Sequence, residues 1–134
     1  MAFKFTLSNS SGVPYYRQIV NQVMYGVANK LLKPGERLPT VRQLAVDLQV
    51  NLNTIVKAYN ELELRRVVNT QQGTGTFVSE SGAHIDPNEK QKAIERVCCK
   101  FLDEIASMGL STEEVASTLK KIVNERKIPG KEID

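Results

Sequence analysis

The sequence lacks the residues on which most metal and nucleophilic active sites depend. It has no tryptophan and a single histidine, His84, and its two cysteines, Cys98 and Cys99, are adjacent. Neighbouring cysteines cannot connect distant parts of a fold, so stability must come from a packed core. No P-loop, no GxGxxG pattern and no cluster with zinc-ligand spacing is present. We therefore expect no enzymatic activity, no metal and no cofactor.

Long hydrophobic runs are also missing. No apolar stretch approaches the roughly 18 residues of a membrane span, and the N-terminal sequence MAFKFTLSNSSG lacks the apolar core of a signal peptide. With only two cysteines, a reducing compartment fits best. The expected location is the cytoplasm, with no membrane partner.

Basic residues dominate the first part of the chain. Residues 1–79 hold nine basic residues against four acidic ones, whereas residues 80–134 hold nine against eleven. The formal charge is thus +5 on the first part and −2 on the second. This asymmetry favours a polyanion-binding module joined to a second part, although a solvated surface has the same signature.

Turn-forming residues suggest where the two parts meet. The stretch SESGAHIDPN interrupts every apolar period. We predict a first domain over residues 1–79, a linker over residues 80–88 and a second domain over residues 89–134.

The first predicted helix starts at or just after Pro14 and ends before residues 33–35, Lys-Pro-Gly. Residues 36–38 are too short for a helix and should be extended. The helix is defined by apolar residues at a 3.6-residue period, namely Ile19, Val20, Val23, Met24, Val27 and Leu31.

Two short helices separated by a tight turn follow. Thr40 and Asn51 are candidate N-caps, and the second of these helices should reach about Arg65. Such a pair is typical of a helix-turn-helix. Short β-branched segments at residues 67–70 and 76–78, joined by a glycine-containing turn, predict a β-hairpin, and hence a winged helix.

The helix after Asn51 has a polar face with the chemistry of base recognition. If its apolar residues face the core, the opposite face presents Asn53, Val56, Lys57 and Asn60. Asparagine can pair with adenine, lysine donates to guanine or phosphate, and valine suits a thymine methyl. A merely solvated polar face is the alternative.

Residues outside that helix are further candidates for DNA contacts. Arg42 can reach a phosphate or the groove edge, with a surface ion pair as the alternative. Thr40 can donate to a phosphate or act only as a cap. Gly73 and Gly75 allow backbone N–H groups to approach a phosphate, or serve only as turn residues.

Beyond the linker, two amphipathic helices carry apolar faces that they cannot bury against each other alone. Gly109 should end the first, and residues 111–114 resemble a capping box for the second. We expect a homodimer whose interface comprises Ile94, Val97, Cys98, Phe101, Leu102, Ile105, Leu119 and Ile122.

The motifs of residues 14–78 together resemble the GntR superfamily of bacterial transcription regulators. They are PYYRQI, PGERLPTVRQLA, VNLNTIVKAYNELE and GTGTFV. The NxNTxxKAY wording and the short two-helix tail are similar to the YtrA subfamily.

The resemblance implies a mainly α fold with a small β-hairpin, a winged helix-turn-helix followed by a two-helix C-terminal dimerisation domain. It also implies inverted-repeat operators, commonly of transporter or cell-envelope operons. An effector ligand stays open, because no pocket can be assigned in so short a tail. The DNA contacts carried over by position are Thr40, Arg42, Asn53, Thr54, Lys57, Gly73 and Gly75.

Three residues depart from the family pattern. Leu52 replaces a usual proline or arginine, Arg66 replaces a usual glycine at a helix end, and residues 71–72, Gln-Gln, replace a commonly basic pair. Leu52 should change which bases this position recognises. Arg66 argues against a left-handed residue at the end of the third helix, and the two glutamines should weaken a phosphate contact.

We therefore predict a homodimeric, sequence-specific DNA-binding transcriptional regulator, with repression as the expected outcome. The alternative is a winged-helix module that binds protein without specific DNA binding. That alternative predicts an apolar or acidic third-helix face, which Asn53 and Lys57 do not provide.

Overall fold

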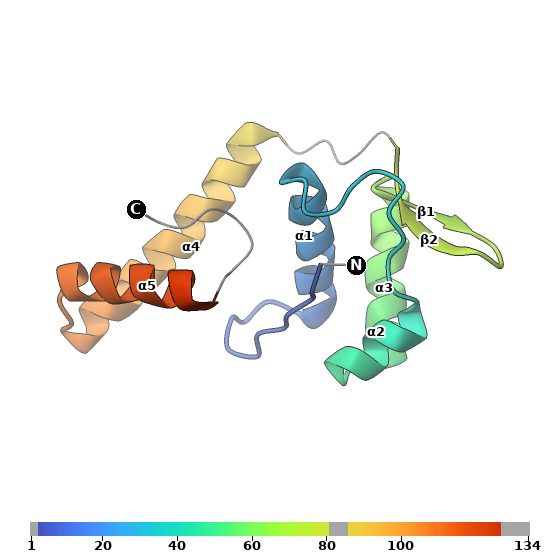
Figure 1. Cartoon of the computed structure of the whole chain (residues 1–134). Helices are drawn as coiled ribbons and strands as arrows, with labels where there is room; N and C mark the ends of the chain where they lie inside the picture. Colours follow the sequence, from blue (N-terminus) through green and yellow to red (C-terminus); the bar gives the residue numbers. More distant parts are fainter. Residues whose placement is uncertain (1–2, 81–85, 127–134) are drawn as a thin grey trace. The chain divides into compact units, whose positions relative to one another are not determined.

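The computed structural model describes residues 3–80 and 86–126, and the chain divides into two compact units, Met1–Ile85 and Asp86–Asp134 (Figure 1). The first contains α1 (Tyr15–Ala28), α2 (Val41–Leu48), α3 (Leu52–Leu64), β1 (Val68–Gln71) and β2 (Gly75–Val78). The second contains α4 (Pro87–Met108) and α5 (Thr112–Arg126). This order confirms the predicted fold class, a winged helix-turn-helix followed by two C-terminal helices.

The predicted linker overlaps the start of α4. Asp86 caps this helix by accepting a hydrogen bond from the backbone N–H of Asn88 at 2.9 Å, and Pro87 occupies its first turn. The prediction that residues 87 and 88 belong to the linker is therefore wrong, because an aspartate cap followed by proline starts a helix here. Residues 81–85, including His84, lie outside the described residues.

The core of the first unit lies between the helices and the hairpin. The N-terminal segment adds Phe5, and the extended stretch before α2 adds Leu38. Most of the core comes from the inward faces of the three helices and from the hairpin, namely Ile19, Val20, Val23, Leu44, Ile55, Ala58, Leu62, Val68 and Val78.

The end of α1 differs from the periodic pattern. The helix stops at Ala28, and Lys30 adopts a φ of 63°. The N–H groups of Leu31 and Leu32 both donate to the carbonyl of Gly26, at 2.8 and 3.0 Å. This turn leaves Leu31 40% exposed and places Leu32 in the core, so the prediction that the helical period continues to Leu31 is wrong.

The hairpin gains a third, short extended segment. β1 and β2 pair antiparallel, with Val68 opposite Val78 and Gln71 opposite Gly75. Residues 36–38 run along β2: Leu38 N–H donates to the carbonyl of Thr76, and Val78 N–H donates to that of Glu36, both at 2.8 Å. This confirms the expected extended conformation of residues 36–38.

Candidate nucleic-acid interface

The helix-turn-helix is held by caps at both of its helix starts. Thr40 accepts a hydrogen bond from the N–H of Gln43, and the Gln43 side chain accepts one from the N–H of Thr40, which together form a capping box. The Asn51 side chain accepts from the N–H of Asn53 at 2.8 Å. Both cap predictions are confirmed, and they fix where each helix begins.

The turn between α2 and α3 depends on a left-handed residue. Gln49 has a φ of 57°, and the next N–H, from Val50, donates to the carbonyl of Ala45 at 3.0 Å. Ala45 is 8% exposed, so a small side chain stands where the chain turns back on the helix.

The inward face of α3 is anchored firmly. Ile55, Ala58 and Leu62 have no exposed surface. Tyr59 donates its hydroxyl hydrogen to the carbonyl of Pro39 at 2.6 Å, which ties α3 to the start of α2. Burial raises the pKa of this phenol above its ordinary value, so the hydroxyl keeps its proton to a higher pH than that of an exposed tyrosine.

With that face buried, the start of α3 presents polar side chains outward. Asn53 is exposed, Thr54 is half-buried, and Lys57 is exposed one turn further along. The Lys57 ammonium Nζ lies 4.0 Å from the centroid of the Tyr16 ring, a cation–π contact with α1. The side chain therefore lies along the α1 edge of the outward face rather than the hairpin edge.

An ion-pair network neutralises the acidic residue on the same edge. The Arg17 guanidinium binds both carboxylate oxygens of Glu61, at 2.6 and 3.0 Å, and Arg65 Nε lies 3.4 Å from Glu61 Oε2. Hydrogen bonds to Tyr16 and to Glu61 raise the pKa of Arg17. The carboxylate of Glu61 thus adds little net negative charge to this surface.

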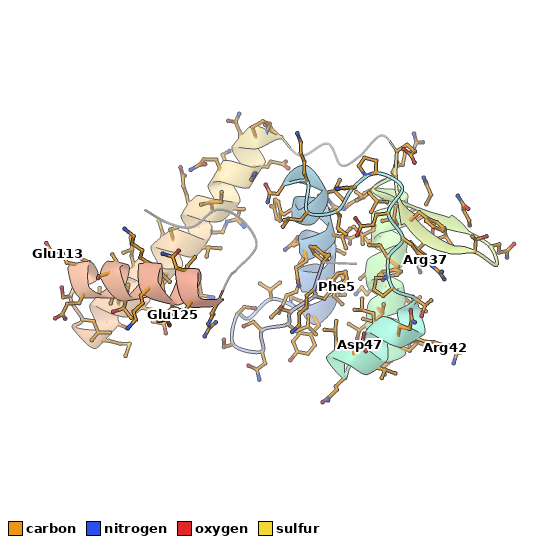
Figure 2. All side chains as sticks on the ribbon, viewed as in Figure 1. Phe5, Arg37, Arg42, Asp47, Glu113 and Glu125 are labelled. Atoms are coloured by element: carbon orange, nitrogen blue, oxygen red, sulfur yellow. The ribbon has the colours of Figure 1, made fainter. Side chains whose placement is uncertain are left out.

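Arg42 projects from the first turn of α2, on the outer side of the helix pair (Figure 2). It is exposed and forms no ion pair within the described residues. A shallow hollow of about 470 Å³ lies beside it, lined also by Val46, Val50 and Leu52. Leu52 is 37% exposed there, so it offers an apolar contact at the position where the family pattern has proline or arginine.

The hairpin and α3 enclose a larger open groove of about 510 Å³. On the helix side it is lined by Val56, Asn60 and Glu63, and on the hairpin side by Thr70 through Thr76. Gly73 and Gly75 lie in this hairpin wall with φ values of 79° and 137°, which few residues with a side chain adopt. Nothing lies within 4 Å of a Cβ placed on Gly73, so its backbone is open to a partner.

Arg37 also lines this groove, and sequence reasoning missed it as a candidate. The sequence did contain a signal for Arg37. In an extended segment neighbouring side chains point to opposite sides, and Leu38 is buried, so Arg37 must face away from the core.

The second unit leaves much of its apolar surface uncovered. Phe101 lines an open groove of about 300 Å³ together with Leu110, Val115, Leu119 and Ile122. Ile105, which the sequence places in the dimer interface, is only 4% exposed, so the chain itself already covers most of this side chain. The other predicted interface residues are exposed, namely Ile94 (47%), Val97 (70%), Cys98, Phe101 (40%), Leu102 (50%), Leu119 (41%) and Ile122 (37%).

No helix in the described ranges combines the length and apolar character that a membrane crossing requires. Within the same ranges, no three His, Cys, Asp or Glu side chains gather closely enough to hold a metal ion.

Residues 15–78 match the sequence profile of the family described as bacterial regulatory proteins, gntR family. The chain is 37% identical over 110 residues to the HTH-type transcriptional regulator YhcF of Bacillus subtilis, covering 82% of this chain and 90% of that protein. It is 32% identical over 112 residues to the HTH-type transcriptional repressor YtrA of the same organism, covering 84% and 86%.

Solved structures agree with these relatives. A transcriptional antiterminator from Listeria monocytogenes superposes with a TM-score of 0.58 at 29% identity, covering 98% of this chain and 97% of that one. YtrA from Sulfolobus acidocaldarius, a GntR-family transcription factor, gives a TM-score of 0.55 at 32% identity, covering 71% and 97%. The chain belongs to the GntR family of helix-turn-helix transcriptional regulators.

Proposed function

We propose that the chain represses transcription by placing α3 in the major groove of a two-fold operator as a homodimer. The observation that carries this proposal is the exposed polar start of α3: Asn53 is exposed there, Arg42 is exposed in the first turn of α2, and the opposite face of α3 is buried. In a helix-turn-helix, the N-terminal residues of the second helix reach the base edges.

Each candidate residue has a role that its chemistry permits. Asn53 can pair with adenine through two hydrogen bonds, and Lys57 can leave the Tyr16 ring to donate to guanine or phosphate. Arg42 supplies a cation at the groove edge.

The remaining candidates position the protein on the DNA backbone. The hydroxyls of Thr40 and Thr54 can donate to phosphates, and the backbone at Gly73 and Gly75 can approach a phosphate or the minor groove.

Repression rests on the relative YtrA of Bacillus subtilis, which is described as a repressor. Control of a transporter or cell-envelope operon stays a prediction of the family resemblance.

Selection of bound duplexes from a random library tests DNA recognition. We expect enrichment of an inverted repeat with half-sites about one helical turn apart or somewhat more. In binding assays with the enriched duplex, Asn53→Ala should change base preference, because a bidentate base contact contributes about 1–3 kcal/mol of discrimination.

Lys57→Ala and Arg42→Ala should weaken binding more than the control Arg66→Ala, which removes an exposed arginine beyond the end of α3. Enrichment of no sequence would contradict the proposal. A larger loss from Arg66→Ala than from Asn53→Ala and Lys57→Ala together would move the reading site to the wing.

Homodimerisation rests on the exposed apolar side chains of α4 and α5. Contiguous apolar surface of this kind marks an association site, and a two-fold operator requires a two-fold protein. Sedimentation of the full chain should show a dimer.

Phe101→Asp should give monomers, because the dimer would have to bury an unpaired carboxylate. Cys99→Asp is the matched control: it adds the same charge on α4, at an exposed residue outside the proposed interface. A folded monomer for the unmodified chain would refute the dimer.

A further inference from the structure

The hairpin has no basic residue of its own. Between Val67 and Val78 the sequence holds no lysine or arginine, and glutamines stand at residues 71 and 72. Backbone N–H groups alone release few counterions, and charge neutralisation supplies most of the sequence-independent affinity, so a nearby cation would strengthen the contact of the wing with the DNA backbone.

A neighbouring segment supplies that cation. Residues 36–38 run beside β2, and Arg37 pairs with Phe77 across the two segments. Because Leu38 points into the core, Arg37 points to the opposite side, and Figure 2 shows it beside α3 and the hairpin.

The wing leaves room for this guanidinium. A Cβ placed on Gly75 would lie 2.9 Å from Arg37 Nε and 3.4 Å from both Cζ and Nη2. Any other residue at position 75 would have to displace the arginine and would also be strained at a φ of 137°. Gly75 therefore does more than form a turn: it lets Arg37 lie against the hairpin backbone.

The position of Arg37 suits a phosphate. It lines the groove between α3 and the hairpin with Asn60 and Val56, and no acidic side chain of the described residues pairs with it. Glu63 is the acidic residue of the groove, and the Thr70 hydroxyl donates to its carboxylate at 3.4 Å. Among the residues that line this groove Arg37 is the one cation, and the amide of Asn60 is a neutral donor on the α3 side, so the two form a local site for one anion.

We propose that Arg37 is the cation of the wing and binds a phosphate of the DNA strand that passes between α3 and the hairpin. This inference rests on the proposed DNA binding and adds a contact that the family motifs did not assign. It explains how the wing can engage DNA although glutamines occupy its commonly basic pair.

Salt-dependent binding tests the inference. The variants are Arg37→Gln, which removes the charge, and Arg37→Lys, which keeps it, with Lys4→Gln as an exposed control of equal charge change on the N-terminal segment. The probes are the duplex enriched by the unmodified chain and a random 30-base-pair duplex.

For Arg37→Gln we expect the slope of log affinity against log salt to fall by about one. If the two proteins bind equally at 1 M salt, this change of slope corresponds to an affinity about five-fold lower for Arg37→Gln at 0.15 M salt. The loss of affinity should be similar on both duplexes. Arg37→Lys should retain the slope. Ethylation of single phosphates should interfere with the unmodified chain at one more position per half-site than with Arg37→Gln.

The outcomes separate this inference from the proposed function. If the unmodified chain binds neither duplex, the proposed function itself fails. If it binds and Arg37→Gln matches Lys4→Gln in slope and interference pattern, only the phosphate contact is refuted. A loss confined to the enriched duplex would also overturn it, since that outcome identifies a base contact.

Discussion

Replacing Arg66 by glycine should stabilise the first unit, because this residue ends α3 in a left-handed conformation. Its φ is 60°, its N–H donates to the carbonyl of Glu63, and the N–H of Val67 donates to that of Leu62, both at 3.0 Å. This pair of bonds is the Schellman arrangement, in which the left-handed position is most often glycine. The buried contact that usually accompanies it is available here from Leu62 and Val67, both in the core.

The magnitude follows from two opposing costs. A residue with a Cβ pays roughly 1–2 kcal/mol in the left-handed region. Glycine avoids that cost but loses more backbone entropy on folding, about 0.5–1 kcal/mol relative to alanine. Arg66→Gly should therefore exceed Arg66→Ala in the free energy of unfolding by about 0.5–1 kcal/mol.

Urea unfolding followed by tyrosine fluorescence measures this difference. The chain has no tryptophan, and its four tyrosines all lie between residues 15 and 59, so the signal reports the first unit alone. Protein concentration must be held constant, because association shifts apparent stability.

Position 65 is the internal control for the same pair of substitutions. Arg65 has a φ of −80°, in the right-handed region, so glycine there should be less stable than alanine by about 0.5–1 kcal/mol. If glycine and alanine rank the same way at positions 65 and 66, the left-handed strain assigned to Arg66 is refuted.

Substitutions at two further positions probe the helix-turn-helix scaffold. Tyr59→Phe should cost about 1 kcal/mol in urea unfolding, because the carbonyl of Pro39 loses its donor. Burial raises the folded pKa of Tyr59 above the unfolded value of about 10, so the unmodified chain should lose stability as pH rises above 10. If the free energy of unfolding of Tyr59→Phe fell equally steeply above pH 10, the loss of stability would not come from Tyr59. Thr40→Ala should lower the free energy of unfolding by about 0.5–2 kcal/mol, and Thr40→Ser should restore most of it. Equal losses for both would show that the hydroxyl does not act as the cap.

Helix starts could be predicted from the sequence, because a cap acts through its own side chain on an N–H two or three residues away. Thr40 and Asn51 were identified from residue type alone, and both make the expected bonds. The hairpin could be predicted for the same reason, because its turn glycines and its β-branched strand residues are neighbours in the sequence.

Helix ends were harder, because glycine was the signal expected there. Among the four helices whose ends lie in the described residues, only α4 ends at a glycine, Gly109, with a φ of 71°, whereas α1, α2 and α3 close through Lys30, Gln49 and Arg66. These three residues have no intrinsic preference for the left-handed region, so the hydrogen bonds and core contacts of the closed turn must impose it. For this reason the end of α1 at Ala28 could not be predicted from periodicity. For the same reason the absence of glycine at position 66 wrongly argued against a left-handed residue at the end of α3.

Arg37 shows a different limit of the sequence. Its extended conformation was predicted, but its place against Gly75 depends on the pairing of residues 36–38 with β2, some 40 residues later. Ile105 is similar: its period places it on an apolar face, and only the folded structure shows that this side chain is 4% exposed.

The placement of charge, more than its amount, makes the first unit suited to a polyanion. A formal charge of +5 over residues 1–79 is modest. However, two of the nine cations, Arg17 and Arg65, bind Glu61 and so neutralise an acid near the outward face of α3. Arg37 and Arg42 pair with no acid among the described residues, and Lys57 rests on an aromatic ring.

If this placement governs affinity, Glu61→Gln should barely strengthen DNA binding, because its carboxylate is already compensated. Glu63→Gln should strengthen it more, since Glu63 lines the groove with only a hydroxyl donor at 3.4 Å. Equal effects from the two substitutions, in the salt-dependent assay used for Arg37, would show that total charge alone sets the affinity.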